Sequence, residues 1–262
     1  MGITVVTGAA SGMGEAAVKL LHDRESLLLC DLNAARLQAV SASLAPPAKA
    51  EMLAGDIADP GFPDRLVTAL RGRPIDSLIH CAGISPTMGQ PARILDVNLT
   101  ATIRLVEVIR PRMAAGGAAV LFASTAAHLI GTALDEKIAA ARTPESVASL
   151  AAVAPNPGAA YSISKRGVQL LVKREAVNFG RHEARIVSVS PGVIDTPMGR
   201  AEMVQHPIMQ TLIDHSPLRR AARAEEVAAV AVFLCSPAAS FVTGTDVLVD
   251  GGSIAAGAGQ PA

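Results

Sequence analysis

The amino-terminal stretch places a short apolar strand, a glycine turn and a helix in direct succession. Residues 3–7 read Ile-Thr-Val-Val-Thr, a β-branched run typical of a buried strand, and Gly8, Gly12 and Gly14 follow it. Glycines let the backbone approach a phosphate closely, and the amino terminus of a helix offers free N–H groups and a positive dipole end. The stretch therefore predicts a dinucleotide-phosphate site, with an ordinary strand-to-helix turn as the alternative.

The rest of the chain alternates strands with helices. The further predicted strands are residues 27–30, 51–53, 77–80, 118–123, 187–190 and 247–249. Half of the 262 residues are apolar and only 2% are aromatic, which suits helices packed closely on a parallel sheet. We therefore expect an α/β fold, a Rossmann-like doubly wound parallel sheet of seven strands with helices on both faces. Residues 1–254 form the single domain in this prediction, and residues 255–262 form a flexible tail.

Composition excludes several classes of protein. The formal net charge is zero and no basic block occurs, so nucleic acid is not an expected partner. Cys30, Cys81 and Cys235 are far apart, which predicts neither a metal site nor a disulfide framework and fits a reducing cytoplasm. The amino terminus has no basic region typical of a signal peptide. Residues 113–134 lack charged side chains, but glycines and polar residues interrupt them, which favours a buried strand and loop over a membrane span.

Two aspartates follow predicted strands. A carboxylate at Asp31 can accept both hydroxyls of an adenosine ribose and repels a 2′-phosphate. Neither Leu32 nor Ser11 offers a cation for that phosphate, so the sequence favours NAD over NADP. The alternative is that Asp31 caps the next helix. Asp56, with Ile57 beside it, is placed to meet the adenine edge, or else it is a turn aspartate.

Polar side chains with acid–base chemistry occur later in the chain. Tyr161 is the only tyrosine, and Lys165 lies on the same helical face one turn on. A cation at that distance lowers a tyrosine pKa by roughly 1–3 units, toward the range useful for proton transfer. The alternative is a packed tyrosine below a solvated lysine. Ser124 ends a predicted strand, and Asn98 lies in a helix predicted over residues 92–115, where it is structural or anchors a polar relay.

Taken together and in this order, the motifs resemble the short-chain dehydrogenase/reductase family in its short single-domain form, over residues 3–252. In this resemblance Asn98, Ser124, Tyr161 and Lys165 match the catalytic tetrad. Pro191-Gly192 and Thr196 match the loop that holds the nicotinamide carboxamide, and residues 243–252 match the last strand. The resemblance implies cofactor contacts from Gly8, Ser11, Gly12, Met13, Gly14, Asp31, Leu32, Asp56, Ile57, Cys81, Ala82, Gly83, Tyr161, Lys165, Pro191, Gly192, Val193, Ile194 and Thr196.

Two departures from the family pattern stand out. Cys81-Ala82-Gly83 replaces the usual Asn-Ala-Gly, for which we expect a repacked turn rather than lost activity. Ser124 and Tyr161 are separated by an insertion of about residues 129–158, within which residues 135–153 predict one or two Ala-rich helices. Both features resemble the bacterial 3α-hydroxysteroid dehydrogenase/carbonyl reductases. Such an insertion is usually functional or part of an interface.

The resemblance implies NAD-dependent hydride transfer between a secondary alcohol and a ketone. Tyr161 would exchange the hydroxyl proton, Lys165 would lower its pKa and bind the nicotinamide ribose, Ser124 would orient the substrate oxygen, and Asn98 would hold a water. A substrate lobe is expected over residues 195–217. Its apolar residues suit a bulky hydrophobic or steroid-like substrate, or else they are ordinary helix packing. They are Met198, Met203, Ile208, Met209 and Leu212.

Four histidines are expected to lie outside the chemistry: His80 as a satisfied core residue, and His128, His206 and His215 as incidental neighbours. Two alternative functions remain. A sugar-nucleotide epimerase or dehydratase needs a larger carboxyl-terminal domain than the roughly seventy residues after residue 190. A catalytically silent NAD-binding regulator usually lacks the tyrosine or the lysine. We expect a homo-oligomer, dimer or tetramer, with the insertion either covering or joining an interface.

Overall fold

One parallel sheet organises the protein. The computed structural model describes residues 2–21, 26–46, 49–205 and 208–257. Seven strands lie in the order β3-β2-β1-β4-β5-β6-β9, and all neighbouring pairs are parallel. The strands are β1 (Ile3–Thr7), β2 (Leu27–Asp31), β3 (Ala50–Ala54), β4 (Ile75–His80), β5 (Met113–Phe122), β6 (Arg185–Pro191) and β9 (Asp246–Val249). The predicted seven-stranded Rossmann-like fold is confirmed, and its strand order reverses between β1 and β4.

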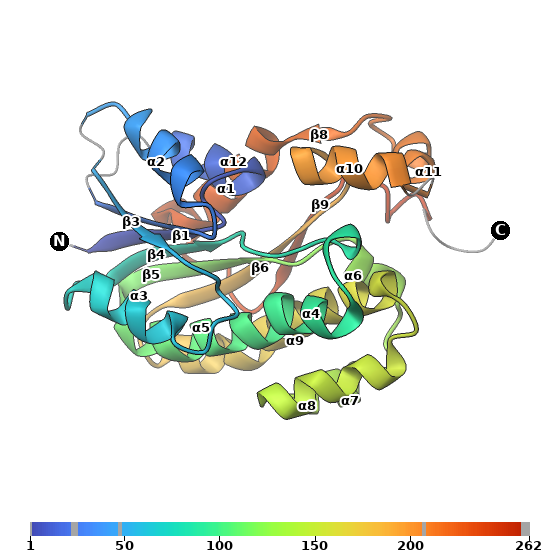
Figure 1. Ribbon diagram of the computed structural model, residues 1–262, viewed down its shortest axis with the longest axis horizontal. Coiled ribbons are helices and arrows are strands. Elements are labelled where there is room, and N and C mark those ends of the chain that lie inside the picture. Colours follow the sequence, from blue (N-terminus) through green and yellow to red (C-terminus); the bar gives the residue numbers. More distant parts are fainter. Residues whose placement is uncertain (1, 22–25, 47–48, 206–207, 258–262) are drawn as a thin grey trace.

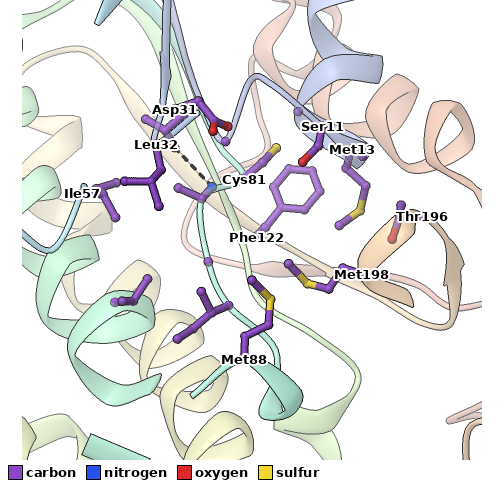
Figure 2. Close-up of a pocket in the computed structure, with 18 of the residues that line it drawn as sticks. Ser11, Met13, Asp31, Leu32, Ile57, Cys81, Met88, Phe122, Thr196 and Met198 are labelled. Carbon is purple, nitrogen blue, oxygen red and sulfur yellow. Dashed lines mark hydrogen bonds between the residues drawn. The ribbon is translucent and has the colours of Figure 1, made fainter. Parts of the chain in front are cut away.

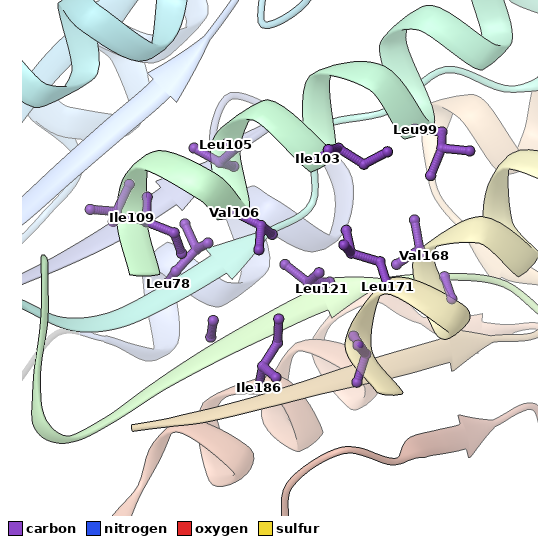
Figure 3. Close-up of a cluster of buried hydrophobic side chains, with 14 of the residues drawn as sticks. Leu78, Leu99, Ile103, Leu105, Val106, Ile109, Leu121, Val168, Leu171 and Ile186 are labelled. Carbon is purple, nitrogen blue, oxygen red and sulfur yellow. The ribbon is translucent and has the colours of Figure 1, made fainter. Parts of the chain in front are cut away.

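Helices cover both faces of this sheet (Figure 1). On one face lie α1 (Gly12–Leu20), α2 (Ala34–Ala42) and α12 (Ala224–Cys235). On the other lie α3 (Phe62–Leu70), α4 (Pro91–Leu95), α5 (Ala101–Ile109) and α9 (Pro157–Gly180). Figure 3 shows the core of this second layer, where Leu78, Leu121 and Ile186 of the sheet meet Val106 of α5 and Leu171 of α9. Both faces of the central strands are buried, which explains the continuous apolar run of residues 27–30 in β2 in place of an alternating pattern.

The helix predicted over residues 92–115 is shorter and interrupted. Helix α4 passes through a π-helical turn (Asp96–Thr100) into α5, and a 3-10 turn (Arg110–Arg112) leads directly into β5. Pro111 has no N–H to continue a helix, so the helix ends there and the strand begins earlier than expected. Asn98 lies inside the π-helical turn, a distortion that often accompanies functional sites.

The segment 129–158 contains helices within residues 135–153, as its composition predicts. It follows α6 (Ala126–Leu129) and contains α7 (Asp135–Ala140), α8 (Pro144–Ser149) and a 3-10 turn (Leu150–Val153). These helices lie on the outer side of α9, away from the sheet (Figure 1). Arg166 of α9 forms a bidentate ion pair with Asp135 of α7, with N–O distances of 2.8 and 2.5 Å. The insertion is therefore fastened to the helix that carries Tyr161.

A small second unit overhangs the carboxyl ends of the strands. It consists of α10 (Pro197–Gln205), α11 (Ile208–His215) and a two-stranded pair formed by β7 (Ile194–Asp195) and β8 (Ala222–Arg223), which the sequence did not predict. Helix α10 also contacts the 3-10 turn Pro86–Met88 that follows β4. A last 3-10 turn, Pro237–Ala239, follows α12. Among the described residues no helix is long and apolar enough to cross a membrane.

Candidate active site

A cavity of about 390 Å³ opens at the carboxyl edge of the sheet, where the strand order reverses. Figure 2 shows Asp31, Leu32 and Ile57 on one side of it and Met88 and Met198 on another. The strand ends at a reversal of this kind are where open α/β sheets bind ligands. Sixteen residues predicted for cofactor contact border it besides Tyr161 and Lys165: Gly8, Ser11, Gly12, Met13, Gly14, Asp31, Leu32, Asp56, Ile57, Cys81, Ala82, Gly83, Pro191, Gly192, Ile194 and Thr196.

Val193 is the predicted cofactor residue that does not border the cavity. Its side chain is buried against Leu212, with Met203 and Met209 packed alongside. The neighbouring Ile194 does line the cavity, and adjacent residues of an extended segment point in opposite directions. A cofactor contact through the Val193 side chain is not supported by this position, and a contact through its backbone stays a prediction.

The glycine turn gives the cavity its first wall. Gly8 and Gly12 have positive φ values of 69° and 54°, which favour glycine. A Cβ on Gly14 would lie 2.0 Å from the carbonyl oxygen of Gly8, and one on Gly8 would lie 2.8 Å from the N atom of Ala82. The N–H groups of the first turn of α1 have no partner inside the helix and border the cavity. This cradle fits a dinucleotide pyrophosphate.

Asp31 lies beside this cradle with its carboxylate held by two backbone groups. One oxygen accepts the N–H of Ala10 at 3.0 Å, and the other accepts that of Asn33 at 2.9 Å. Helix α2 is capped by Asn33, whose side chain accepts the N–H of Arg36 at 3.1 Å. The capping role considered for Asp31 is thus taken by Asn33, and the Asp31 carboxylate is fixed at the edge of the cavity.

Asp56 has the turn role that the sequence offered as one alternative, and its contact with the adenine edge stays a prediction. One carboxylate oxygen accepts the N–H of Ala58 at 2.9 Å, as in a turn. The other pairs with the guanidinium of Arg93, which also contacts Asp96 at 3.2 Å. Arg93 lines the cavity, and the sequence analysis missed it. No local pattern signals this pair, because its members are 37 residues apart and meet only through the fold.

Tyr161, Lys165 and Ser124 meet at the same cavity. The Lys165 Nζ lies 5.7 Å from the centre of the Tyr161 ring and donates a hydrogen bond to the Phe122 carbonyl at 2.8 Å. Helix α9 presents both residues in its first turns, and Asn156 caps that helix by accepting the N–H of Ala159 at 2.9 Å. The predicted pair therefore shares one helix face beside the serine that ends β5.

The electrostatics of the pair differ from the prediction. Burial, aided by the charge of Glu202, raises the pKa of Tyr161 to about 12, although a hydrogen bond with Ser124 acts in the opposite sense. Burial lowers the pKa of Lys165 to about 8, while Cys81 and Glu202 raise it. The expectation of a lowered tyrosine pKa is wrong for the protein by itself, because desolvation of the phenolate is the larger effect.

Asn98 is engaged in a backbone brace and does not line the cavity. Its Oδ1 accepts the N–H of Ile84 at 2.8 Å, and its Nδ2 donates to the Ile84 carbonyl at 2.9 Å and to Ser164 Oγ at 3.3 Å. Its own carbonyl accepts the Thr102 hydroxyl at 2.9 Å. These contacts tie the segment after β4 to α9, so Asn98 has the structural role that the sequence analysis considered. Its second role, holding a water, stays a prediction.

Three of the four histidines named in the sequence analysis lie among the described residues, and none of these three borders the cavity. His80 is buried between the hydroxyls of Thr7 and Thr102, at 2.7 and 2.8 Å. Burial lowers the pKa of His80 to about 3, so it is a neutral core residue, as predicted. His128 bonds to Asp246 at 2.9 Å and His215 to a backbone carbonyl at 2.8 Å, and neither borders the cavity. His206 lies outside the described residues.

The substrate lobe contributes a mixed lining. Met198 and Met209 border the cavity, whereas Met203, Ile208 and Leu212 do not, so the apolar set is partly lining and partly packing. The same wall includes Glu202, a carboxylate that the sequence analysis missed because it considered only apolar residues there. Thr196, expected near the carboxamide, accepts the N–H of Gly199 at 3.0 Å and thereby caps α10.

The fold and the cavity define a dinucleotide-binding protein whose acid–base residues stand beside the ligand cradle. Residues 2–134 match the family model described as short chain dehydrogenase, and residues 139–253 match the one described as enoyl-(acyl carrier protein) reductase. The chain therefore belongs to the short-chain dehydrogenase/reductase family of oxidoreductases, which use a nicotinamide cofactor.

Individual relatives agree with this assignment over nearly their whole length. Levodione reductase of Leifsonia aquatica is 30% identical and the match covers 97% of this chain and 94% of that protein. The 3-alpha-hydroxysteroid dehydrogenase/carbonyl reductase of Comamonas testosteroni is 29% identical, with 96% of each chain covered. The crystal structure of a 3-alpha-hydroxysteroid dehydrogenase from Pseudomonas sp. B-0831, complexed with NADH, superposes with a TM-score of 0.83 at 26% identity, covering 99% of this chain and 100% of that one. The two alternative functions are not favoured.

Proposed function

We propose that this protein is an NAD-dependent oxidoreductase that interconverts a secondary alcohol and a ketone. The observation that carries the proposal is one continuous cavity. The glycine turn and Asp31 line it, and so do Tyr161, Ser124 and Lys165. A cofactor cradle and a proton-exchanging pair in the same space are what such a reaction needs.

The roles of the chain's own residues follow from this arrangement. The backbone N–H groups of the glycine turn would hold the pyrophosphate, and Asp31 and Lys165 would hold the two riboses. When bound there, a nicotinamide cofactor would provide the hydride chemistry at the substrate carbon in either direction. The Tyr161 hydroxyl donates a proton to the alkoxide oxygen in reduction and receives it in oxidation. Ser124, hydrogen-bonded to Tyr161, orients the substrate oxygen, and the charge of Lys165 favours the phenolate.

The preference for NAD over NADP rests on Asp31. Two backbone N–H groups hold its carboxylate beside the turn, so it cannot swing away from a 2′-phosphate. The nearby Arg36 is engaged as well, because its Nε donates to the Ala10 carbonyl at 3.1 Å and its guanidinium lies 3.8 Å from Glu15. A fixed carboxylate accepts ribose hydroxyls and repels a second anion.

The substrate is proposed to be bulky and largely apolar. Ile84, Met88, Met198 and Met209 supply an adaptable lining. The names of two relatives, levodione reductase and 3-alpha-hydroxysteroid dehydrogenase/carbonyl reductase, point to cyclic ketones as the class to test first. Three free cysteines fit a reducing compartment, and we propose a cytoplasmic location.

Assembly is proposed to be homo-oligomeric, with residues 129–158 setting its form. Helices α7 and α8 occupy the outer side of α9 and of the π-helical turn, so that side is covered by the chain itself. A covered face favours a dimer built elsewhere over a tetramer that uses α9. A mass from light scattering distinguishes the two.

The test of the function is a panel of cyclic, steroid and aliphatic secondary alcohols, each assayed with NAD and with NADP. Appearance of reduced cofactor, followed by its absorbance, supports the proposal. Binding of NADH without turnover of any alcohol or ketone would favour the silent regulator instead.

A further inference from the structure

The substrate side of the cavity carries a carboxylate among methionines. Glu202 of α10 borders the cavity together with Met88, Met198 and Met209. Figure 2 shows Met88 and Met198 on this side. The charge of Glu202 acts on both catalytic partners, since it raises the pKa of Tyr161 and also that of Lys165. The carboxylate is therefore close to the place where a substrate would react.

The start of α10 fixes where the backbone of Glu202 lies. The Thr196 hydroxyl accepts the N–H of Gly199 at 3.0 Å, and the Thr196 carbonyl accepts that of Arg200 at 2.8 Å. A Cβ on Gly199 would lie 2.0 Å from the Ile194 carbonyl oxygen, so the helix backbone rests directly against β7. Glu202 is three residues beyond Gly199 and shares its face of the helix, which is the face that lines the cavity.

Arg200 illustrates the opposite orientation. Its guanidinium pairs with Asp195 at 2.7 Å, and both side chains are largely exposed. The cation of this helix start is thus directed to the surface and the anion to the cavity. The substrate therefore meets a negative charge in the lobe that covers it.

We propose that Glu202 selects substrates that carry a hydroxyl or ammonium group next to the reacting carbon, and that it disfavours substrates carrying a carboxylate. This inference rests on the proposed oxidoreductase function. An ionised carboxylate has about four acceptor sites, so it can bond a substrate donor besides its contacts within the protein. A purely apolar substrate would instead remove water from the Glu202 carboxylate without offering it a hydrogen bond, which costs free energy. The favoured substrate is then an apolar ring or chain with two neighbouring polar groups, such as a diol or hydroxy ketone.

The test uses four alcohols on one ring: cyclohexanol, trans-cyclohexane-1,2-diol, trans-2-aminocyclohexanol and trans-2-hydroxycyclohexanecarboxylate. The kcat/KM of each with NAD is divided by that of cyclohexanol, so general effects on turnover cancel. The wild-type protein is expected to rank the amine and the diol above cyclohexanol and the carboxylate below it. A hydrogen bond to a charged group changes binding by about 10- to 100-fold. Glu202→Gln should therefore lower the kcat/KM of the amine relative to cyclohexanol by about that factor. It should raise the carboxylate ratio about tenfold by removing a like charge.

Asp214→Asn is the matched control. Asp214 belongs to the neighbouring helix α11, bonds to Gln210 at 2.8 Å and does not border the cavity, so all four ratios should stay at their wild-type values. A second readout is the pH profile of kcat/KM. Its alkaline-rising limb should move to lower pH in Glu202→Gln, because the carboxylate raises the pKa of Tyr161. A merely structural role would lower all four rates together and leave the profile in place.

The outcomes separate the two levels of the proposal. Turnover of the ring alcohols with unchanged ratios in Glu202→Gln overturns the role of Glu202 and leaves the oxidoreductase function standing. If the wild-type protein prefers the carboxylate substrate to the amine, the proposed role of Glu202 is overturned without the need for a variant. If NADH binds but no alcohol or ketone in this and the wider panel reacts with NAD or NADP, the proposed function fails, and the inference fails with it.

Discussion

Replacing Asp31 with serine should exchange the cofactor preference. The hydroxyl of serine can still accept one of the backbone N–H groups that Asp31 holds at 2.9 and 3.0 Å, so the turn should persist. Two unit charges 4 Å apart interact by about 4 kcal/mol at an effective dielectric constant of 20. Because Asp31 is partly exposed, solvent weakens its repulsion of a 2′-phosphate to about 2 kcal/mol. Removing the carboxylate should therefore raise the affinity for NADPH about 30-fold.

The same substitution weakens NAD. A hydrogen bond to a charged acceptor contributes about 1.5–3 kcal/mol, and losing one ribose contact of this kind costs about tenfold or more. The ratio of NADH to NADPH affinity should therefore fall about 300-fold, since the two effects multiply.

Cofactor titration measures this ratio without knowledge of the substrate. The chain contains no tryptophan, so the titration follows the fluorescence of the bound NADH or NADPH, or the heat of binding. Asp64→Asn, which removes an exposed carboxylate on α3, is the control and should leave both affinities unchanged. A wild-type protein that binds NADPH as tightly as NADH, or an Asp31→Ser variant with the wild-type ratio, would refute the reasoning.

Two further predictions concern stability. Burial lowers the pKa of Lys165 from 10.5 to about 8, so between these values the unfolded chain holds a proton that the folded protein has lost. The free energy of unfolding should therefore rise with pH across that window, by at most about 3 kcal/mol more than in Lys165→Met. Urea unfolding of both proteins at pH 7 and pH 10 measures this difference. If the two proteins showed the same change with pH, the buried lysine would not be its source. Asp135→Asn should remove the ion pair with Arg166 and lower the Tm by about 2–4 °C, for a loss of about 1 kcal/mol. Because Arg166 lowers the pKa of Asp135, this difference should shrink as the pH falls below 3.8, and a constant difference in calorimetry would contradict the assignment.

Local patterns were enough for the framework of the site. The β-branched run before Gly8, the spacing to Gly14 and the carboxylate after the second strand are contiguous signals, and the structure brings them to one cavity. The helix over residues 92–115 was overextended because apolar spacing continued past Pro111, which ends it. The order of the motifs along the chain also identified Ser124, Tyr161 and Lys165. Their spacing in the sequence does not predict how far apart they lie in the folded protein.

Features that depend on three-dimensional packing were not predictable. The pairing of Arg93 with Asp56 joins α4 to the segment after β3, and only the sheet order brings them together. The raised pKa of Tyr161 comes from burial, which a helical i to i+4 spacing cannot convey. Glu202 follows no apolar period, and it faces the cavity because Gly199 fixes how α10 rests against β7.

The most direct test of the central claim is turnover by Tyr161→Phe, measured as appearance of NADH with an alcohol that the wild-type protein oxidises. The substitution removes one hydroxyl and keeps the ring, and a general acid–base group contributes about 10²- to 10⁴-fold to rate. We predict a fall in kcat of at least about 100-fold with NADH affinity unchanged within about threefold, as judged by cofactor titration. A variant that turns over at the wild-type rate would contradict the assignment of proton transfer to Tyr161, and with it the proposed mechanism.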